Sequence, residues 1–344
     1  MVISHPHEHI AGPVLVTGGA GYIGGQTVLC LLDMGIDVVV LDDLSTGRRL
    51  PFHEHACFYH GRVQDQALVE KILREHHVKS VLHFAGSIKV DESIADPLKY
   101  YENNTEGSRC LIEAAVNTAV ECFIFSSTAA VYGQVSSDGP VTEETDVLPL
   151  NPYGWSKLFT ERALKDVSKA KGLQYGILRY FNVAGADPSL RHGQYLENPV
   201  HLIGRAIDAM TGKASPLSIF GDDLPTPDGT GVRDYIHVYD LAQAHLAALA
   251  FLNSTNDNLH VNLGYGRGHS VREVVKCLEE VSAISVPHNV VAAREGEAPS
   301  VVADISRVQK TLKWQPQYDN LHEIIQSALN WDQKLNSDSV NKGQ

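Results

Sequence analysis

The sequence predicts an α/β fold in which a doubly wound parallel sheet is joined to a second, smaller mixed α/β region. Short apolar runs alternate with amphipathic stretches along the first half of the chain, which is typical of parallel strands joined by helical crossovers. A glycine-rich turn separates the first run from the first amphipathic stretch. The 344 residues are 43% apolar, which is enough to bury the core of one large domain or of two closely joined ones.

The elements of the predicted sheet follow one another in a regular order. We expect strands at 14–17, 37–41, around 58–59, at 80–84, 122–126 and 174–179. We expect helices at 23–34, 66–76, 97–116 and 153–171, where apolar residues recur with helical spacing. Gly35 supplies a stop for the first of these helices. This order gives the doubly wound domain the bounds 13–181.

The alternation weakens after Asn182, so residues 182–333 are expected to form the smaller, substrate-binding region. Prolines and glycines cluster at 216–231, and a last helix is expected after Asn320. Residues 234–252 could instead pack back on the first domain. We expect residues 1–12 to form a flexible extension and residues 334–344 to form a polar tail that frays.

The formal net charge of −13 at pH 7 would repel phosphate backbones and anionic lipids. We therefore expect neither nucleic acid nor a membrane surface as a partner, and an anionic substrate would need a local cationic pocket. No stretch reaches the roughly 18 consecutive apolar residues of a membrane span. The N-terminus lacks the basic and apolar regions of a signal peptide.

The cysteines stand singly, and no pair has the spacing of metal ligands. They are Cys30, Cys57, Cys110, Cys122 and Cys277. We expect buried free thiols in a reducing compartment and therefore place the protein in the cytoplasm. The segment HPHEH at 5–9 suggests a metal site, but its proline, its polarity and its lack of hydrophobic period favour a loose extension. No metal site is expected.

The glycine-rich turn has the spacing of a dinucleotide-binding motif. Gly18, Gly21 and Gly24 follow a predicted strand and open a predicted helix, so the backbone can approach a pyrophosphate held at the helix N-terminus. Asp42 closes the second strand, where a carboxylate accepts hydrogen bonds from ribose hydroxyls. Asp43 adds a charge that would repel a 2′-phosphate. The sequence therefore predicts a Rossmann-type unit that binds NAD rather than NADP, with an ordinary glycine loop as the alternative.

A second motif carries candidate catalytic groups. Tyr153 and Lys157 are four residues apart at the start of a predicted helix, so their side chains share a face. We expect the ammonium, together with an oxidised nicotinamide, to lower the pKa of Tyr153 and make it a base near neutral pH. Thr128 ends a strand at the ligand-binding edge of the sheet and could hydrogen-bond the reacting hydroxyl. Ser126 and Ser127 precede it and could equally be turn or cap hydroxyls.

Several segments together resemble the extended short-chain dehydrogenase/reductase family, in its NAD-dependent epimerase/dehydratase branch. They are TGGAGYIGG, HFAGS, YYENNTEG, FSSTAAVYG, NPYGWSK, LRYFNVAGA, DGTGVRDYIHV and REGEAPSVVAD. The likeness runs from about Val14 to about Trp331. It implies a Rossmann domain with tightly held NAD and a homodimer built through a helix bundle. It also implies an isomerase that interconverts UDP-glucose and UDP-galactose through a transient 4-keto sugar and bound NADH.

The resemblance also implies roles for individual residues. On the cofactor side these are Tyr22 and Ile23 at the pyrophosphate, Phe84, Ala85 and Gly86 at the adenosine, and Asn103 and Phe181. On the substrate side they are Thr128, Tyr153, Asn182, Asn198, Phe220, Arg233, Arg294, Glu297 and Val301. The two arginines suit the diphosphate of a nucleotide sugar, because a guanidinium binds phosphate through paired hydrogen bonds.

The sequence departs from the family pattern at some positions. The 4,6-dehydratases have Asp-Glu after the threonine, whereas this chain has Ala129 and Ala130, so dehydration is not expected. Arg62 stands where the family usually has an aspartate that meets the adenine amino group, and we expect weaker cofactor retention. Val301 stands where a tyrosine restricts some members to unacetylated sugars, and its smaller side chain leaves room for a 2-acetamido group.

Other functions remain open at this point. One is a related epimerase that acts on a UDP-uronate or a UDP-pentose. Another is a noncatalytic NAD-sensing protein of the same fold, against which the intact Tyr153, Lys157 and Thr128 speak. A third is a net dehydrogenase or reductase with exchangeable NAD.

Overall fold

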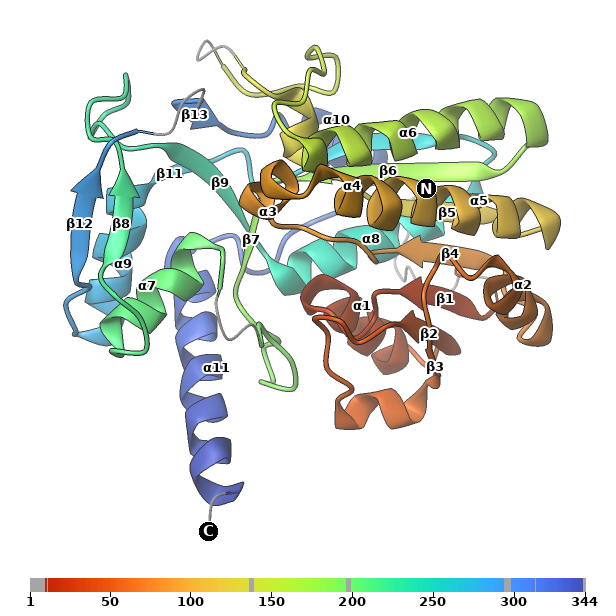
Figure 1. Cartoon of the computed structure of the whole chain (residues 1–344), viewed down its shortest axis with the longest axis horizontal. Coiled ribbons are helices and arrows are strands. Elements are labelled where there is room, and N and C mark those ends of the chain that lie inside the picture. The colour runs from red at the N-terminus through yellow and green to blue at the C-terminus, as the bar shows by residue number, and fades with distance from the viewer. Residues whose placement is uncertain are drawn as a thin grey trace.

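A parallel sheet forms the centre of the larger lobe (Figure 1). The computed structural model describes residues 10, 12–135, 139–195, 199–293, 298–312 and 314–342, with side chains up to 338. In this part of the chain the largest sheet has seven strands, in the order β10-β6-β5-β4-β1-β2-β3. They are β1 (Val14–Thr17), β2 (Val38–Asp42), β3 (Cys57–His60), β4 (Ser80–His83), β5 (Cys122–Ser126), β6 (Gln174–Tyr180) and β10 (Leu259–Leu263). The strand order reverses between β1 and β4, which opens a crevice at their carboxyl ends.

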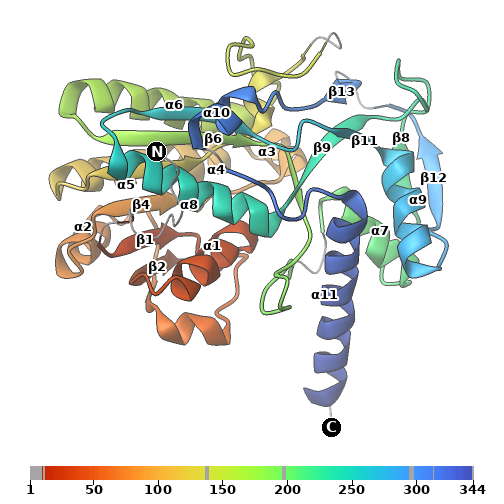
Figure 2. The ribbon, with the colours of Figure 1, turned by 180° about the vertical axis from the view of Figure 1, so that it is seen from behind.

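Helices cover both faces of this sheet. Figure 2 shows α1 (Tyr22–Asp33) and α8 (Val238–Ser254) on one face. On the other face lie α2 (Gln66–Glu75), α5 (Gly107–Asn117) and α6 (Pro152–Lys171). Successive strand residues point to opposite faces, so Val14 and Val16 pack with α1 and α8, whereas Leu15 packs with α2 and α5.

The expected strands and helices of the first domain are present, with small shifts at their ends. The long helix expected at 97–116 consists of α4 (Pro97–Tyr100), a π-helical turn (Tyr101–Glu106) and α5. The sequence did not predict α3 (Val90–Ala95), which precedes α4.

One strand of the large sheet comes from the part of the chain that we expected in the smaller region. β10 pairs in parallel with β6 and forms an edge of the sheet, so the bounds 13–181 omit one strand. The preceding helix, α8, packs against α1, β5 and β6 and returns the chain to this edge. The expectation missed β10 because its apolar run lies far along the chain, beyond the segment in which the alternation weakens.

A smaller mixed region lies at the carboxyl ends of the large sheet (Figure 1). Its four-stranded sheet contains β7 (Asn182–Ala184), β9 (Val232–His237), β11 (Gly268–Ser270) and β13 (Ser300–Val301), of which β9 and β11 are antiparallel. A second pair of strands consists of β8 (Leu217–Phe220) and β12 (His288–Val291). The helices of this region are α7 (Leu202–Met210), α9 (Val271–Ser282) and α11 (Leu321–Lys342). The helix α10 (Ser306–Leu312) instead packs against β10 and α8 of the larger lobe.

The tail expected to fray is helical as far as Lys342. The first half of α11 buries Ile324, Ile325 and Leu329 in the core, and the Lys334 ammonium donates a 2.6 Å hydrogen bond to the carbonyl of Leu190. A helix that is already nucleated by packing extends at low cost, because each further residue adds one backbone hydrogen bond. The C-terminal end of α11 projects away from the body (Figure 1).

The cysteines only partly meet the expectation of buried thiols. Cys30, Cys110 and Cys122 are buried and Cys277 is half-buried, but Cys57 is exposed because it begins β3, the edge strand of the sheet. The described residues contain no cluster of side chains that could hold a metal ion. The histidines of HPHEH lie outside the described residues. None of the described helices is long and apolar enough to cross a membrane.

Candidate functional site

The glycine turn is packed so closely that side chains would not fit. Gly18 has φ +69°, and a Cβ there would lie 2.6 Å from the backbone nitrogen of Ala85. A Cβ on Gly24 would overlap the carbonyl oxygen of Gly18. Gly21 donates a 3.0 Å hydrogen bond to that same carbonyl and caps α1. The turn therefore holds the N-terminus of α1 against the ends of β1 and β4, with its first-turn N–H groups lacking helical acceptors.

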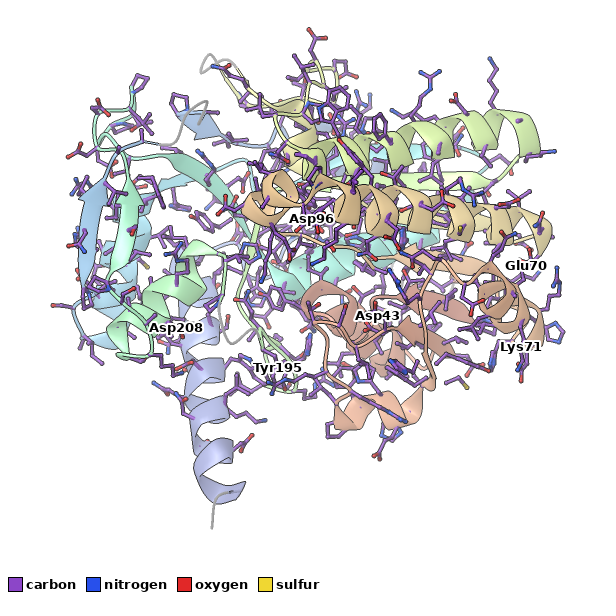
Figure 3. All side chains as sticks on the ribbon, in the orientation of Figure 1. Asp43, Glu70, Lys71, Asp96, Tyr195 and Asp208 are labelled. Atoms are coloured by element: carbon purple, nitrogen blue, oxygen red, sulfur yellow. The ribbon has the colours of Figure 1, made fainter. Side chains whose placement is uncertain are left out.

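Asp42 holds this turn from the end of β2. One carboxylate oxygen accepts a 2.9 Å hydrogen bond from the Ala20 N–H, and the other accepts a 2.8 Å bond from the Leu44 N–H. Burial raises the pKa of Asp42, and these two hydrogen bonds oppose the rise. The side chain of Asp43, labelled in Figure 3, instead accepts from the backbone and hydroxyl of Ser45.

A cavity of about 360 Å³ opens beside the turn at the carboxyl ends of the strands. Of the residues expected at the cofactor, its walls include Gly18, Gly21, Asp42, Asp43, Phe84, Ala85, Gly86 and Asn103. Tyr22, Ile23, Gly24 and Phe181 are not among its lining residues. The Tyr22 side chain points elsewhere, and its hydroxyl donates a 2.6 Å hydrogen bond to the carbonyl of Gly185.

The start of α6 brings the candidate catalytic groups together. The Asn151 side chain caps the helix by accepting a 2.9 Å hydrogen bond from the Gly154 N–H. Tyr153 and Lys157 both lie on the buried face of the helix, and the Tyr153 hydroxyl is hydrogen-bonded to Thr128. The Lys157 ammonium donates a 3.0 Å bond to the carbonyl of Ser126 and lies 4.9 Å from the ring centre of Phe125.

The expected lowering of the pKa of Tyr153 is not found in the protein alone. Burial raises this pKa, and the hydrogen bond with Thr128 lowers it only in part. The Lys157 ammonium donates its hydrogen bond to the carbonyl of Ser126, not to the Tyr153 hydroxyl. Burial also lowers the pKa of Lys157 to about 8, against the opposing effect of the Glu161 carboxylate.

A buried ion pair lies one turn further along α6, and the sequence analysis missed it. Arg179 donates hydrogen bonds of 2.9 and 2.6 Å to the two carboxylate oxygens of Glu161. Ser127 donates a 2.6 Å bond to the same carboxylate. Because Glu161 follows Lys157 by four residues, the helical spacing could have placed it on the same face. The Ser127 hydroxyl is thus a structural contact of this pair.

The loop after β4 approaches Lys157. A Cβ on Gly86 would lie 3.7 Å from the Lys157 nitrogen. Asn104 holds this loop by accepting a 2.7 Å bond from the Ser87 N–H and donating to the Ser87 carbonyl and the Ser156 hydroxyl. Asn104 was also missed, although it is the neighbour of the expected Asn103. The wall of the cavity at Gly86 therefore meets the Tyr153–Lys157 group.

Arg62 lies on an exposed part of the cavity wall. Its guanidinium is 3.8 Å from the Glu102 carboxylate, and both side chains are more than half exposed. Gln64 donates a 3.2 Å hydrogen bond to the side chain of Asn103 beside them.

The small sheet gathers several residues expected at the substrate. Arg233 of β9 is in register with Val301 of β13, and its neighbour Tyr235 is in register with Asn182 of β7. The Arg233 guanidinium donates a 2.8 Å bond to the carbonyl of Val232. Phe220 ends β8, in the second pair of strands. Asn198, Arg294 and Glu297 lie outside the described residues.

A doubly wound sheet, a glycine turn at its switch point and a Tyr–Lys helix beside the same cavity define the class of short-chain dehydrogenases and reductases. The model of the NAD dependent epimerase/dehydratase family matches residues 14–264. The chain belongs to this family.

Individual relatives match nearly the whole chain. A UDP-glucose 4-epimerase from Azospirillum brasilense is 49% identical over 322 residues, which cover 94% of this chain and 92% of the relative. The crystal structure of the UDP-glucose 4-epimerase from Brucella ovis in complex with NAD superposes with a TM-score of 0.90 at 42% identity, covering 93% and 98% of the two chains. The UDP-Glc/GlcNAc 4-epimerase from Campylobacter jejuni has a TM-score of 0.83 at 40% identity, covering 94% and 100%.

Proposed function

We propose that the protein interconverts UDP-glucose and UDP-galactose by inverting the configuration at C4 of the sugar, with NAD as its resident cofactor. The observation that carries this proposal is that the Tyr153 group and the cavity beside the glycine turn are in contact. The Tyr153, Thr128 and Lys157 group lies against Gly86, and Gly86 also lines the nucleotide cavity. The Azospirillum and Brucella relatives, which are UDP-glucose 4-epimerases, support the choice of reaction.

The residues around the cavity fit NAD. Gly18 and Gly86 line the cavity without side chains, and the start of α1 offers free N–H groups to a pyrophosphate. Asp42 and Asp43 would face the adenosine ribose and exclude a 2′-phosphate. Tyr22, Ile23, Gly24, Asn103 and Phe181 would complete the site through their backbone or their packing. When bound, NAD accepts the hydride from C4 and returns it.

The residues of this chain then handle the proton and the geometry. Thr128 would orient the C4 hydroxyl, and Tyr153 would take its proton and later give it back to the 4-keto oxygen. Lys157 would supply a positive charge that favours the phenolate, in addition to the charge of the oxidised nicotinamide. For the configuration to invert, the keto sugar must turn within the site before the hydride returns.

The substrate would be held by its nucleotide part. We assign its diphosphate to Arg233 and Arg294, because guanidinium groups bind phosphates through paired hydrogen bonds. Asn182, Asn198, Phe220 and Glu297 would contact the rest of the UDP group. These contacts must be firm while those to the sugar stay adaptable, since the sugar has to turn.

A second substrate is favoured by Val301. This half-buried side chain packs in the cluster that contains Phe181 and Tyr132, beside Arg233. A valine leaves more room there than a tyrosine, so we propose that UDP-N-acetylhexosamines are also accepted. The Campylobacter relative, a UDP-Glc/GlcNAc 4-epimerase, supports this extension. Val301→Tyr should remove activity on UDP-N-acetylgalactosamine and spare activity on UDP-galactose. A variant that loses both activities, or that keeps both, would contradict the proposed role of Val301.

We also propose a homodimer that works in the cytoplasm. The outer surfaces of α3, α4 and α6 expose Ile94, Leu98 and Phe159, which are 63%, 76% and 46% exposed. The Phe159 ring contacts those of Trp155 and Tyr101, so the apolar surface is continuous across the helices. A second copy of the same surface would bury it as a helix bundle. Leu98→Glu with Phe159→Glu should shift the molar mass in light scattering from dimer to monomer.

The decisive experiment replaces the proposed base. Tyr153→Phe should lower kcat on UDP-galactose by roughly 10²- to 10⁴-fold, because the proton acceptor is gone. The variant should still release one NAD per chain on denaturation. Tyr175→Phe, at the far end of β6, is the matched control and should keep normal activity. Near-normal turnover by Tyr153→Phe would refute the assignment.

A further inference from the structure

Two buried histidines hold the cofactor turn from outside the cavity. His53 Nε2 lies 2.9 Å from the carbonyl oxygen of Gly19, and His192 Nε2 lies 2.8 Å from that of Tyr22. The two rings come from distant parts of the chain. His53 follows β2, and His192 belongs to the segment 185–195 after β7. Phe52 packs between them, stacked on His53 at 4.1 Å and edge-on to His192 at 5.7 Å.

The chemistry of the contacts fixes the state of both rings. A carbonyl oxygen only accepts hydrogen bonds, so Nε2 of each ring must carry the proton. His53 Nδ1 then accepts a 2.9 Å bond from the Leu50 N–H. His192 Nδ1 has no hydrogen-bond partner among the described residues. Burial lowers the pKa of His192 to about 4, so its ring is a neutral donor at neutral pH.

Gly25 makes room for the His192 ring. A Cβ on Gly25 would lie 2.8 Å from both Cε1 and Nε2 of His192. The need for glycine here is steric, because the backbone of Gly25 is helical. Any side chain at this position would push the imidazole away from the carbonyl of Tyr22.

Fixing these carbonyls also fixes the N–H groups of the turn. In a trans peptide the N–H points opposite to the C=O of the preceding residue. The hydrogen bond to the Gly19 carbonyl therefore directs the Ala20 N–H the other way, and this N–H does meet Asp42. By the same geometry the bond to the Tyr22 carbonyl orients the Ile23 N–H, which is in the first turn of α1.

The segment that carries His192 is anchored on both sides. Arg191 forms a two-point ion pair with Asp33 at the end of α1, with distances of 2.8 Å. The Trp331 indole of α11 donates a 2.9 Å bond to the carbonyl of Gln194. Tyr195, labelled in Figure 3, packs edge-on against Trp331 at 5.0 Å. His192 thus reaches the turn from a rigid support.

We propose that His192, seated on Gly25, is a positioning residue for NAD, which holds the first turn of α1 in the orientation that receives the pyrophosphate. His53 does the same for the preceding part of the turn. This inference rests on the proposed binding of NAD at the glycine turn.

A double-mutant cycle tests the pairing of Gly25 with His192. We expect His192→Ala to raise the Kd for NAD about tenfold in the NAD-stripped protein, as for loss of one buried hydrogen bond. Gly25→Ser should have a similar effect, because it displaces the ring. The double variant should then be no worse than either single one, instead of about a hundredfold weaker. His55→Ala, an exposed histidine two residues after His53, is the matched control.

Two further readouts separate positioning from general damage. His192→Gln keeps an N–H donor and should restore most of the NAD affinity, whereas His192→Leu should not. The Kd for UDP, whose proposed site lies elsewhere, should stay unchanged in all variants. Unchanged NAD affinity in Gly25→Ser and His192→Leu, strict additivity in the double variant, or an equal loss of UDP affinity would each overturn the proposal. Because these are binding measurements, they stand apart from turnover by the wild-type protein on UDP-galactose, which tests the proposed function.

Discussion

The candidate site contains two arginine–glutamate pairs, one at its Lys157 end and one on the cavity wall. They have the same chemistry but differ in burial and in the distance between the charges. Arg179 and Glu161 are 2% and 1% exposed and meet through two short hydrogen bonds. Arg62 and Glu102 are 52% and 67% exposed and approach only to 3.8 Å. The buried pair lies one helical turn along α6 from Lys157, and the exposed pair lines the cavity beside the glycine turn.

The difference shows how burial decides how much an ion pair contributes to stability and whether its side chains can rearrange. An exposed pair is screened by water and contributes about 0–1 kcal/mol, so its members can rearrange when a ligand arrives. A buried pair has lost its hydration, and each charge depends on its partner. The Lys157 end of the site is therefore fixed before a ligand binds, whereas the Arg62 end is left adaptable.

The largest expected effect comes from breaking the buried pair. Arg179→Met leaves the Glu161 carboxylate buried without its partner and should lower the free energy of unfolding by about 3–5 kcal/mol, measured by urea denaturation. The double variant Arg179→Met with Glu161→Leu should recover most of this loss. A single variant that unfolds like the wild type would mean that the pair is not desolvated in solution.

The next effect is on how activity and stability depend on pH through Lys157. The pKa of Lys157 is lowered to about 8 from 10.5, so the ammonium is lost as pH rises through about 8 and activity should fall there. The free energy of unfolding should rise as pH rises from about 8 to 10.5. In this window the unfolded chain binds a proton at Lys157 that the folded protein does not. Both are measurable as a pH–rate profile and as unfolding curves.

Glu161→Gln sharpens this prediction. The Glu161 carboxylate raises the pKa of Lys157, so its removal should move the fall in activity to lower pH. The exposed pair offers the control, since Glu102→Gln should leave the pH profile unchanged. A profile that does not move in Glu161→Gln would show that Lys157 is not the group that titrates.

A smaller effect is expected at the Arg62 end. Arg62→Asp places a carboxylate where it can accept a hydrogen bond from the adenine amino group, and NAD should be retained about five- to tenfold more tightly. The measurement is the rate of NAD loss during dialysis. Arg62→Ala removes the guanidinium without adding an acceptor and should change retention little. Equal retention in Arg62→Asp and the wild type would mean that adenine does not reach this position.

The smallest effect is expected from breaking the exposed pair itself. Glu102→Gln should change the free energy of unfolding by less than about 1 kcal/mol, and the difference should disappear in high salt because the charges are screened. A loss comparable to that of Arg179→Met would erase the contrast between the two ends.

The sequence by itself determined the parts of the protein that depend on short spacing. The glycine turn, the strands β1 to β6 and the Tyr153–Lys157 helix are local patterns, in which periodicity and backbone sterics act over a few residues. The same local reasoning does not include the elements that surround a side chain. Burial by these elements raises the pKa of Tyr153.

Only the tertiary structure decided which distant residues meet. β10 joins the sheet from 259–263, Arg179 finds Glu161 across two elements, and His192 reaches the cofactor turn through the space left by Gly25. None of these pairings has a sequence spacing that predicts it, because each depends on how whole layers of helices and strands come together. Local patterns thus determine which functional groups this chain carries at the site. Packing determines their ionisation state and holds them in place.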